Sequence, residues 1–401
     1  MEVHIRNLKY EELDAASELS SFAFQMDLNP AVLSSRRLGQ QANLDQVWGA
    51  FDEEERLLAK LHLLPFHIRI GGRLIPMGGI AGVATWPEYR RQGLVAGLLR
   101  HSLERMRSEG ITISMLHPFS FAFYRRYGWE TFVEYKRYTL DMKQVPKRSL
   151  DTAMKIRRIP GKQRAWQLMD EVYRTFSMQY NGMLDRTEEW WISRVISDDL
   201  QLYVVENTEK DMAEGYMMYR VKDKKMHIEE LIYVSEKARQ ALWNLIGNHD
   251  SMARELTLQA PADDDLTYVL DDPRIGQEIV PYFMARIVEV KGFIEAYPFA
   301  RGEEIAFSLH VTDQHAPWND GGFHIRIDED GRASVNKLDV LEQAEGRQSI
   351  ACSIQHLTAW LLGYTSDERL LRKECISGDS ETIARFSNRL TGLTTYFPDF
   401  F

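Results

Sequence analysis

The chain has 401 residues and a formal net charge of −10, from 49 Lys and Arg against 59 Asp and Glu. This balance argues against a nucleic-acid partner, because such binding draws on clustered basic side chains. It suits a cationic substrate, although acidity that serves only solubility explains the same charge.

Other broad classes of protein are also excluded. An apolar run long enough to span a membrane is absent from the sequence. The start, MEVHIRNLKY, lacks the apolar core of a signal peptide, so we expect a cytoplasmic protein. Two cysteines, Cys352 and Cys375, are too few for a disulfide framework or a cysteine metal cluster, and we expect no metal.

The first 145 residues predict one mixed α/β domain. Apolar spacing predicts a helix over 11–26 and a longer one from Leu94 to Met106, which Gly110 ends. A short helix over 119–126 is closed by Gly128. Strands are expected over 48–52, 56–70, 78–86, 111–117 and 131–142, with a hairpin turn at 71–72.

Beyond a polar linker candidate at 143–151, the same order of elements recurs. Helices are expected over 161–177 and 235–249, with strands over 200–207, 215–221, 227–234, 256–260 and 282–290. From about Gly292 the pattern changes to alternating strands and a helix with Leu357, Trp360 and Leu361 on one face, more typical of core than of a lipid cavity. We therefore expect domains at 1–145, 146–291 and 292–401.

The stretch TWPEYRRQGLVAG, residues 85–97, places Arg90, Arg91 and Gly93 at the predicted start of a helix. A helix N-terminus offers unpaired N–H groups and a positive dipole. Gly93 lets backbone approach a ligand, and the two arginines add charge-assisted donors. The loop is therefore a candidate diphosphate site, although a solvated turn at a helix entry explains the same residues.

The unit formed by GVATWPEYRRQGL and LHPFSFAFYRRYGWE resembles the GCN5-related N-acetyltransferases (GNAT), in which this loop grips the pyrophosphate of acetyl-CoA. Their pattern is Arg/Gln-x-x-Gly-x-Gly/Ala. Arg90 and Gly93 fit that pattern, and Val95 stands where a small residue is usual.

Length, domain order and the aromatic C-terminus together resemble the enhanced-intracellular-survival (Eis) acetyltransferases over essentially the whole chain. The resemblance implies tandem GNAT domains with mixed α+β sheets, then a sterol-carrier-protein-like (SCP2-like) α+β domain. The second GNAT domain is expected to be degenerate, since 235–240 (SEKARQ) contains no Gly. It also implies a homo-oligomer, and the family assembles as hexamers.

The same resemblance assigns cofactor roles. Val83, Ala84 and Thr85 match the strand edge that binds the pantetheine arm of acetyl-CoA. The pyrophosphate loop corresponds to Arg90, Arg91, Gln92, Gly93, Leu94, Val95 and Ala96. Phe119 and Ser120 match the start of the short helix near the cofactor.

Tyr124 matches the family's general acid, and the α-carboxylate of Phe401 matches its general base. Tyr127, on the same helix face, is a rival for the acid, and an aromatic tail that only packs on the core is the alternative for the terminus. The family allows an acidic residue where Phe400 stands, which leaves the role of Asp399 open. His117 and Asp27 are weaker candidates for polarising or binding groups.

The resemblance therefore implies an acetyl-CoA-dependent N-acetyltransferase. The acceptor would be a primary amine of a polycation, either an aminoglycoside-like molecule or lysine. Acetyl transfer to an amine needs an acceptor for the ammonium proton and a donor for the leaving thiolate, which a carboxylate and a phenol can supply. The alternatives are a CoA- or lipid-binding carrier that uses the SCP2-like domain, and a catalytically silent regulator.

Overall fold

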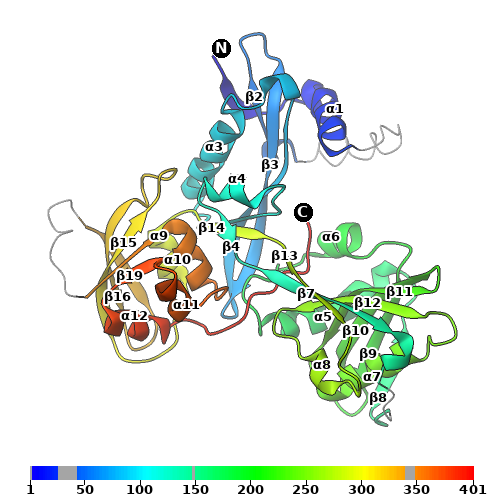
Figure 1. Cartoon of the computed structure of the whole chain (residues 1–401). Coiled ribbons are helices and arrows are strands. Elements are labelled where there is room, and N and C mark those ends of the chain that lie inside the picture. The colour runs from blue at the N-terminus through cyan, green and yellow to red at the C-terminus, as the bar shows by residue number, and fades with distance from the viewer. Residues whose placement is uncertain (1, 26–42, 147–149, 339–347) are drawn as a thin grey trace.

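A computed structural model describes residues 2–25, 43–146, 150–338 and 348–401. Asp27 lies outside the described residues. The chain forms three β-sheets, each covered by helices, and each sheet belongs to one lobe of the molecule (Figure 1). The predicted fold class, mixed α/β sheets in two GNAT-like units followed by an α+β domain, is confirmed.

The first sheet has seven strands in the order β1-β2-β3-β4-β5-β14-β6. Their bounds are β1 (His4–Asn7), β2 (Val47–Phe51), β3 (Leu57–Ile70), β4 (Arg73–Thr85), β5 (Ile113–Leu116), β6 (Glu130–Thr131) and β14 (Met284–Ile287). The helices are α1 (Leu13–Phe24), α3 (Leu94–Ser108) and α4 (Phe121–Arg125). The expected helix over 94–106 is confirmed, because its apolar side chains at spacings of three and four are buried on the sheet.

The second sheet repeats this plan in the order β8-β9-β10-β11-β12-β7-β13. Its strands are β7 (Glu134–Asp141), β8 (Met154–Arg158), β9 (Gln201–Asn207), β10 (Met212–Lys222), β11 (Lys225–Tyr233), β12 (Glu255–Pro261) and β13 (Gly276–Pro281). Its helices are α5 (Lys162–Ser177), α6 (Glu188–Trp190), α7 (Glu236–Gly247) and α8 (Leu266–Val269). Strands β4 and β5 of the first lobe correspond to β11 and β12 of the second, and helix α3 corresponds to α7.

The two sheets exchange one strand each. Strand β7 follows the first sheet in sequence but pairs with β12 and β13 of the second. Strand β14 follows the second sheet but lies between β5 and β6 of the first. The expected domains 1–145 and 146–291 place the 131–142 strand in the first unit and the 282–290 strand in the second. Instead β7 lies in the second sheet and β14 in the first, so the sheets do not follow the sequence boundaries at 145 and 291. Alternation predicts a strand, but not its partners.

The third sheet has the order β17-β16-β15-β18-β19. Its strands are β15 (Ile305–Thr312), β16 (Gly321–Ile327), β17 (Ala333–Lys337), β18 (Ser349–Ser353) and β19 (Ile376–Gly378), with helices α9 (Val290–Ala296), α10 (Ile354–Leu361), α11 (Asp367–Arg372) and α12 (Ser380–Ser387). Leu357, Trp360 and Leu361 of α10 are buried in a core that extends into the first sheet, which confirms that this stripe packs as core.

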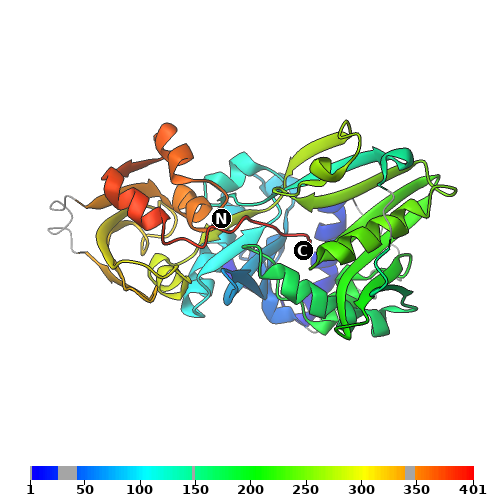
Figure 2. The same cartoon turned by 90° about the horizontal axis from the view of Figure 1, so that it is seen from below.

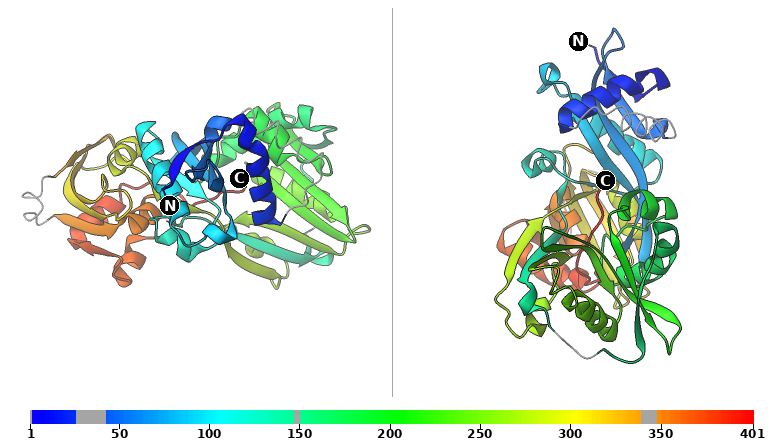
Figure 3. Two further views of the ribbon diagram at one scale, coloured as in Figure 1. Left: turned by 90° about the horizontal axis from the view of Figure 1, so that it is seen from above. Right: turned by 90° about the vertical axis from the view of Figure 1, so that its right-hand side faces the viewer.

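The C-terminal segment after α12 leaves the third lobe and crosses the middle of the molecule (Figure 2). Along the way, backbone hydrogen bonds join Asn181 to Thr394 and Tyr396. The chain ends where the first and second lobes meet, and the view from above and the view from the right both show this position (Figure 3). The last residue of the third lobe thus reaches the first sheet.

Candidate active site

Strands β4 and β5 pair over only part of their length. The parallel register joins Met77–Ile80 to Ile113–Leu116 and then stops. Beyond that point β4 continues to Thr85 alongside β3, with an irregularity opposite Lys60 and His62. Val83, Ala84 and Thr85 therefore carry backbone groups that face the gap to β5 without a strand partner there, and an amide-bearing ligand can pair with that edge.

The loop after β4 delivers the predicted diphosphate residues to the same end of the sheet. Gly93, with φ +82°, is the N-cap of α3, and its side chain position opens onto free space. Among the described residues, no side chain caps the start of α3, and its first turn contains no acidic residue. The N–H groups of the first turn, including those of Leu94, Val95 and Ala96, are therefore available to an anion.

Four side chains of the 90–96 loop bear on whether it can hold a diphosphate. Arg90 and Arg91 are exposed, and neither guanidinium forms an ion pair with a described residue. Gln92 is held in the loop, where its Nε2 donates to the carbonyl oxygen of Glu88 at 3.0 Å. The Val95 side chain packs toward the core of the first sheet, so it does not fill the loop. The residues present thus fit a pyrophosphate.

The short helix α4 holds Tyr124 beside this gap. Ser120 caps the helix, with its hydroxyl oxygen accepting from the Phe123 N–H at 3.3 Å, while Phe119 is 71% exposed. Tyr124 is only 2% exposed, and the rings of Phe119, Phe123 and Trp129 surround it at 5.2–6.4 Å between centroids. Burial raises the pKa of the Tyr124 phenol well above its ordinary value, so the group stays protonated at neutral pH.

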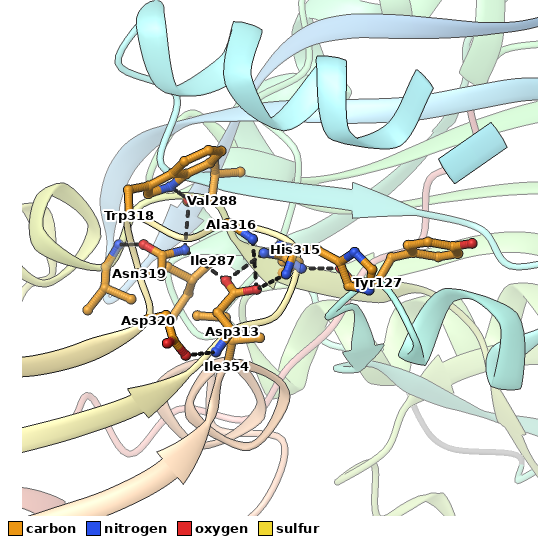
Figure 4. A network of polar contacts seen from close by, with 12 residues as sticks. Tyr127, Ile287, Val288, Asp313, His315, Ala316, Trp318, Asn319, Asp320 and Ile354 are labelled. Atoms are coloured by element: carbon orange, nitrogen blue, oxygen red, sulfur yellow. Dashed lines mark hydrogen bonds and ion pairs between the residues drawn. The ribbon is translucent and has the colours of Figure 1, made fainter. Parts of the chain in front are cut away.

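A buried ion pair supports the turn that follows α4. Arg286 of β14 donates its Nη2 to Asp313 Oδ2 at 2.6 Å, and its Nη1 to the carbonyl oxygen of Tyr127. Figure 4 shows Asp313 in a network that includes the side chain of Asn319, at 3.0 Å, and the backbone N–H groups of His315 and Ala316, at 3.1 Å.

This network has two consequences for the tyrosines. Tyr127 is tied to the third lobe, since its carbonyl accepts from Arg286 and its ring packs 4.9 Å from the His315 ring. Tyr124 instead packs among side chains of the first sheet and α3. The third lobe therefore fixes the α4 turn through β14, and Tyr124 is held by that turn.

The C-terminus approaches the same region of β4 from the opposite face. A side chain at Gly78 would meet Met106 of α3, whereas one at Gly79 would meet the rings of Phe66 and Phe401 at 2.8 and 2.9 Å. Helix α3 and the Phe401 ring therefore lie on opposite faces of the sheet, one residue from where β4 and β5 part. Within the described residues, the terminal carboxylate has no ion-pair partner.

The Phe401 ring is packed among aromatic neighbours. The rings of Phe66 and Phe283 lie 5.0 Å away, and that of Phe397 lies 5.9 Å away. Phe400 is 60% exposed and packs 5.1 Å from the His117 ring. His117 is exposed at the end of β5, and partial burial by its aromatic neighbours lowers the pKa of its imidazole. His117 therefore lies at the surface, and a polarising role for it stays a prediction.

Asp399, two residues before the chain end, is buried and hydrogen-bonded to the second lobe. Its carboxylate accepts from Arg186 Nε at 2.9 Å and from Trp190 Nε1 at 2.7 Å. Arg186 also pairs with Glu230, and all these partners belong to the second lobe. Asp399 thus anchors the tail and has no free carboxylate for a substrate.

The predicted residues thus gather around one gap: the β4 edge, the 90–96 loop, α4 and the chain end. Sequence reasoning missed the groups that hold them, namely Arg286, Asp313, Arg186 and Glu230. The one available signal was apolar context, since Arg286 stands inside the strand-like run YFMARIVEV and a charge buried there requires a partner.

Comparisons with known proteins agree with this geometry. Profiles of the acetyltransferase (GNAT) domain match residues 4–132 and 182–287, and a sterol carrier protein domain profile matches 290–398. N-acetyltransferase Eis of Mycobacterium tuberculosis is 24% identical over 328 residues, 76% of this chain and 78% of that protein.

Solved structures share the fold over the full length. A probable N-acyltransferase from Enterococcus faecalis V583 superimposes with a TM-score of 0.91 at 28% identity, covering 100% of both chains. Eis1 from Mycobacterium abscessus gives a TM-score of 0.79 at 19% identity, covering 99% of this chain and 100% of that one. In the described residues, no helix is long and apolar enough to cross a membrane. Two acetyltransferase (GNAT) domains followed by a sterol carrier protein domain therefore make up this chain, which is similar in sequence to N-acetyltransferase Eis.

Proposed function

We propose that this acetyltransferase moves the acetyl group of acetyl-CoA directly to a primary amine, in a ternary complex at the gap between β4 and β5. One observation carries the proposal: the gap is bordered by an uncapped helix start on one side and by the anchored C-terminus on the other. The first feature suits a diphosphate and the second suits an amine that must lose a proton.

Acetyl-CoA supplies the acetyl thioester when bound. The edge of Val83, Ala84 and Thr85 would pair with the amides of its pantetheine arm, as a strand partner would. Arg90, Arg91 and the first N–H groups of α3 would hold the pyrophosphate. Phe119 presents an exposed ring beside them, and Ser120 acts by capping α4.

The chain's own groups then handle two protons. The α-carboxylate of Phe401 accepts a proton from the substrate ammonium, directly or through water, and so exposes the nitrogen lone pair. The nitrogen attacks the thioester carbonyl, the C–N bond forms and the C–S bond breaks, and the nitrogen passes its second proton through water to solvent as the amide forms. The Tyr124 hydroxyl donates to the departing sulfur, so the products are an amide and the CoA thiol.

Burial of Tyr124 determines how its hydroxyl can assist the departure of the sulfur. A phenol whose pKa is raised keeps its proton, but full transfer to a thiolate of reference pKa about 8.5 is uphill. The phenol therefore acts first as a hydrogen-bond donor to the charge that develops on sulfur, in a site where few solvent dipoles compete. Solvent then equilibrates the thiol and the phenol after product leaves.

The substrate is proposed to be a polycation, either aminoglycoside-like or a lysine side chain. The net charge of −10 supports it. The exposed Phe400 ring and the His117 ring, which carries little positive charge at neutral pH, add an aromatic surface beside the chain end. Aromatic faces attract ammonium groups without needing a second carboxylate.

The test is a thiol-release assay with acetyl-CoA across aminoglycosides, polyamines and lysine peptides. Tyr124→Phe should lower kcat by about 10²-fold or more, the usual scale for losing a general acid. Tyr127→Phe is the matched control and should retain activity. One Gly added after Phe401 displaces the terminal charge without altering a side chain, and should abolish most turnover.

Calorimetric titration with CoA separates the outcomes. We expect Tyr124→Phe and the chain extended by one Gly to bind CoA with the same affinity as the parent protein. A parent protein that binds CoA but releases no thiol with any amine would favour the silent regulator. An extended chain with full activity would remove the carboxylate from the mechanism and leave the acetyltransferase assignment intact.

A further inference from the structure

The second lobe contains a gap like that of the first. Strands β11 and β12 pair only through Lys225–Ile228 and Glu255–Leu258, and then diverge. A cavity of about 300 Å³ lies there, lined by Leu231 and Tyr233 of β11, 258–261 of β12, and residues of α5 and α7. It occupies the place that the acetyl-CoA gap occupies in the first lobe.

The anion-binding features of the first gap are absent from the second. The loop from β4 to α3 spans Trp86–Gly93, whereas β11 and α7 are joined only by Val234–Ser235. Ser235 caps α7, since its hydroxyl oxygen accepts from the Ala238 N–H at 3.2 Å. Glu236 stands in the first turn, where its negative charge opposes a diphosphate.

The remaining lining combines aromatic rings with carboxylates. Four aromatic side chains and three consecutive acids face the cavity: Phe176, Tyr180, Tyr233, Trp243, Asp263, Asp264 and Asp265. Arg239 also lines it, but both its Nε and Nη2 donate to Glu236 at 2.6 Å. Its charge is therefore balanced locally, and the three acids give the cavity a net negative character.

We propose that this cavity binds an organic ammonium ion, such as an alkyl polyamine, as a second site separate from acetyl transfer. Ring faces attract ammonium groups and accommodate methylene chains, while the carboxylates pair with the N–H donors. The inference does not depend on the proposed catalytic roles, because none of its residues belongs to the first lobe.

A metal ion fits the cavity less well. Asp264 Oδ1 already accepts from the Leu266 N–H at 2.9 Å, and the Phe176 and Trp243 rings of the lining supply no oxygen ligand. Across the described ranges, no group of three or more His, Cys, Asp or Glu is arranged to hold a metal.

The test is isothermal titration of the full chain with spermidine, without acetyl-CoA. Asp263→Asn with Asp265→Asn neutralises two exposed acids of the cavity. Asp211→Asn with Asp223→Asn is the matched control, because both are exposed turn residues of the same lobe with positive φ, which Asn tolerates. We expect the cavity pair to weaken one spermidine site at least tenfold and the control pair to leave it unchanged.

A second variant and a second probe complete the design. Tyr180→Leu keeps apolar volume but removes a ring face, and should also weaken that site. Fully acetylated spermidine, which carries no charge, should not bind there. Equal affinity of the cavity and control pairs, equal binding of the neutral probe, or displacement of spermidine by millimolar Mg²⁺ would each overturn the inference. Unchanged thiol release in the cavity pair would show that the two sites are separate.

Discussion

Arg186 Nε lies 2.9 Å from Asp399 Oδ1, and both side chains are 1% exposed. The two residues come from different lobes, and Glu230 also pairs with the same guanidinium. This contact fixes the chain two residues before its end. The position of the terminal carboxylate is therefore set by the second lobe as well as by the aromatic packing around Phe401.

Asp399→Asn should lower both stability and turnover. The substitution leaves Arg186 with one carboxylate partner in place of two, and unbalancing a buried charge costs up to about 3 kcal/mol. A looser chain end should reduce kcat by about tenfold or more, with the KM for acetyl-CoA nearly unchanged, because the side-chain partners of Asp399 are Tyr173, Arg186 and Trp190 and none of these is proposed to hold acetyl-CoA. Urea unfolding and steady-state kinetics measure the two effects, and Asp223→Asn, exposed in the same lobe, serves as the control. If Asp399→Asn lowers stability but leaves kcat unchanged, the contact of Asp399 with Arg186 stabilises the fold without contributing to catalysis.

Local sequence signals were enough for most elements of this fold. The spacing of Leu94, Leu98 and Leu103 predicted α3, and Gly71–Gly72 predicted the β3–β4 hairpin. The exchange of β7 and β14 was not predictable, because alternation marks a strand without naming its neighbours. A pairing between residues 213 positions apart, as in Arg186 and Asp399, leaves no local pattern at all.

Gly128→Ala should destabilise the protein far more than Gly110→Ala. Both glycines have positive φ, +92° and +73°, so each substitution carries a backbone cost of about 1–2 kcal/mol. At Gly128 the added methyl would also collide with the Arg286 guanidinium, whereas at Gly110 it meets nothing within 4 Å. Displacing the buried Arg286 from Asp313 should add about 3 kcal/mol or more. Thermal unfolding compares the two, and equal losses would show that the Arg286 contact adjusts freely.

The candidate site divides in the same way between what was predictable and what was not. The role of the 90–96 loop could be predicted from Arg90, Arg91 and Gly93, because an anion site at a helix start is built from residues that are adjacent in the sequence. The supports of Tyr124 come from β14 and the third lobe, more than 150 residues later in the chain. Such supports become visible only once the strand exchange is known.

Acid should weaken the protein in part through His62. This imidazole lies 3.1 Å from Lys60 Nζ beside the irregular part of β4, and burial together with the Lys60 charge lowers its pKa from 6.5 to about 3. Between pH 6.5 and 3 the unfolded chain binds a proton there that the folded chain does not, so stability falls as pH falls through this window. The expected loss from pH 7 to 4.5 is about 2 kcal/mol.

Two variants on strand β3 check the assignment to His62. His62→Gln should flatten this part of the pH dependence in urea unfolding, because it removes the titrating group. His67→Gln, at an exposed position of the same strand, should preserve it. If His62→Gln follows the same pH profile as the parent, other groups account for the acid sensitivity.

The double change Arg90→Gln with Arg91→Gln should raise the KM for acetyl-CoA, because both guanidinium groups are exposed at the start of α3 and neither forms an ion pair with a described residue. Each charge contributes about 0.3–1 kcal/mol when exposed and more when partly buried, so a rise of about tenfold is expected. Added salt screens such contacts, and 0.5 M NaCl should raise the KM of the parent while hardly affecting the variant. Arg164→Gln with Arg372→Gln removes two exposed arginines of the other two lobes and should change neither the KM nor its dependence on salt. If the KM of the parent does not change with salt, and the KM of the double variant is no higher than that of the parent, the diphosphate is held by backbone N–H groups alone.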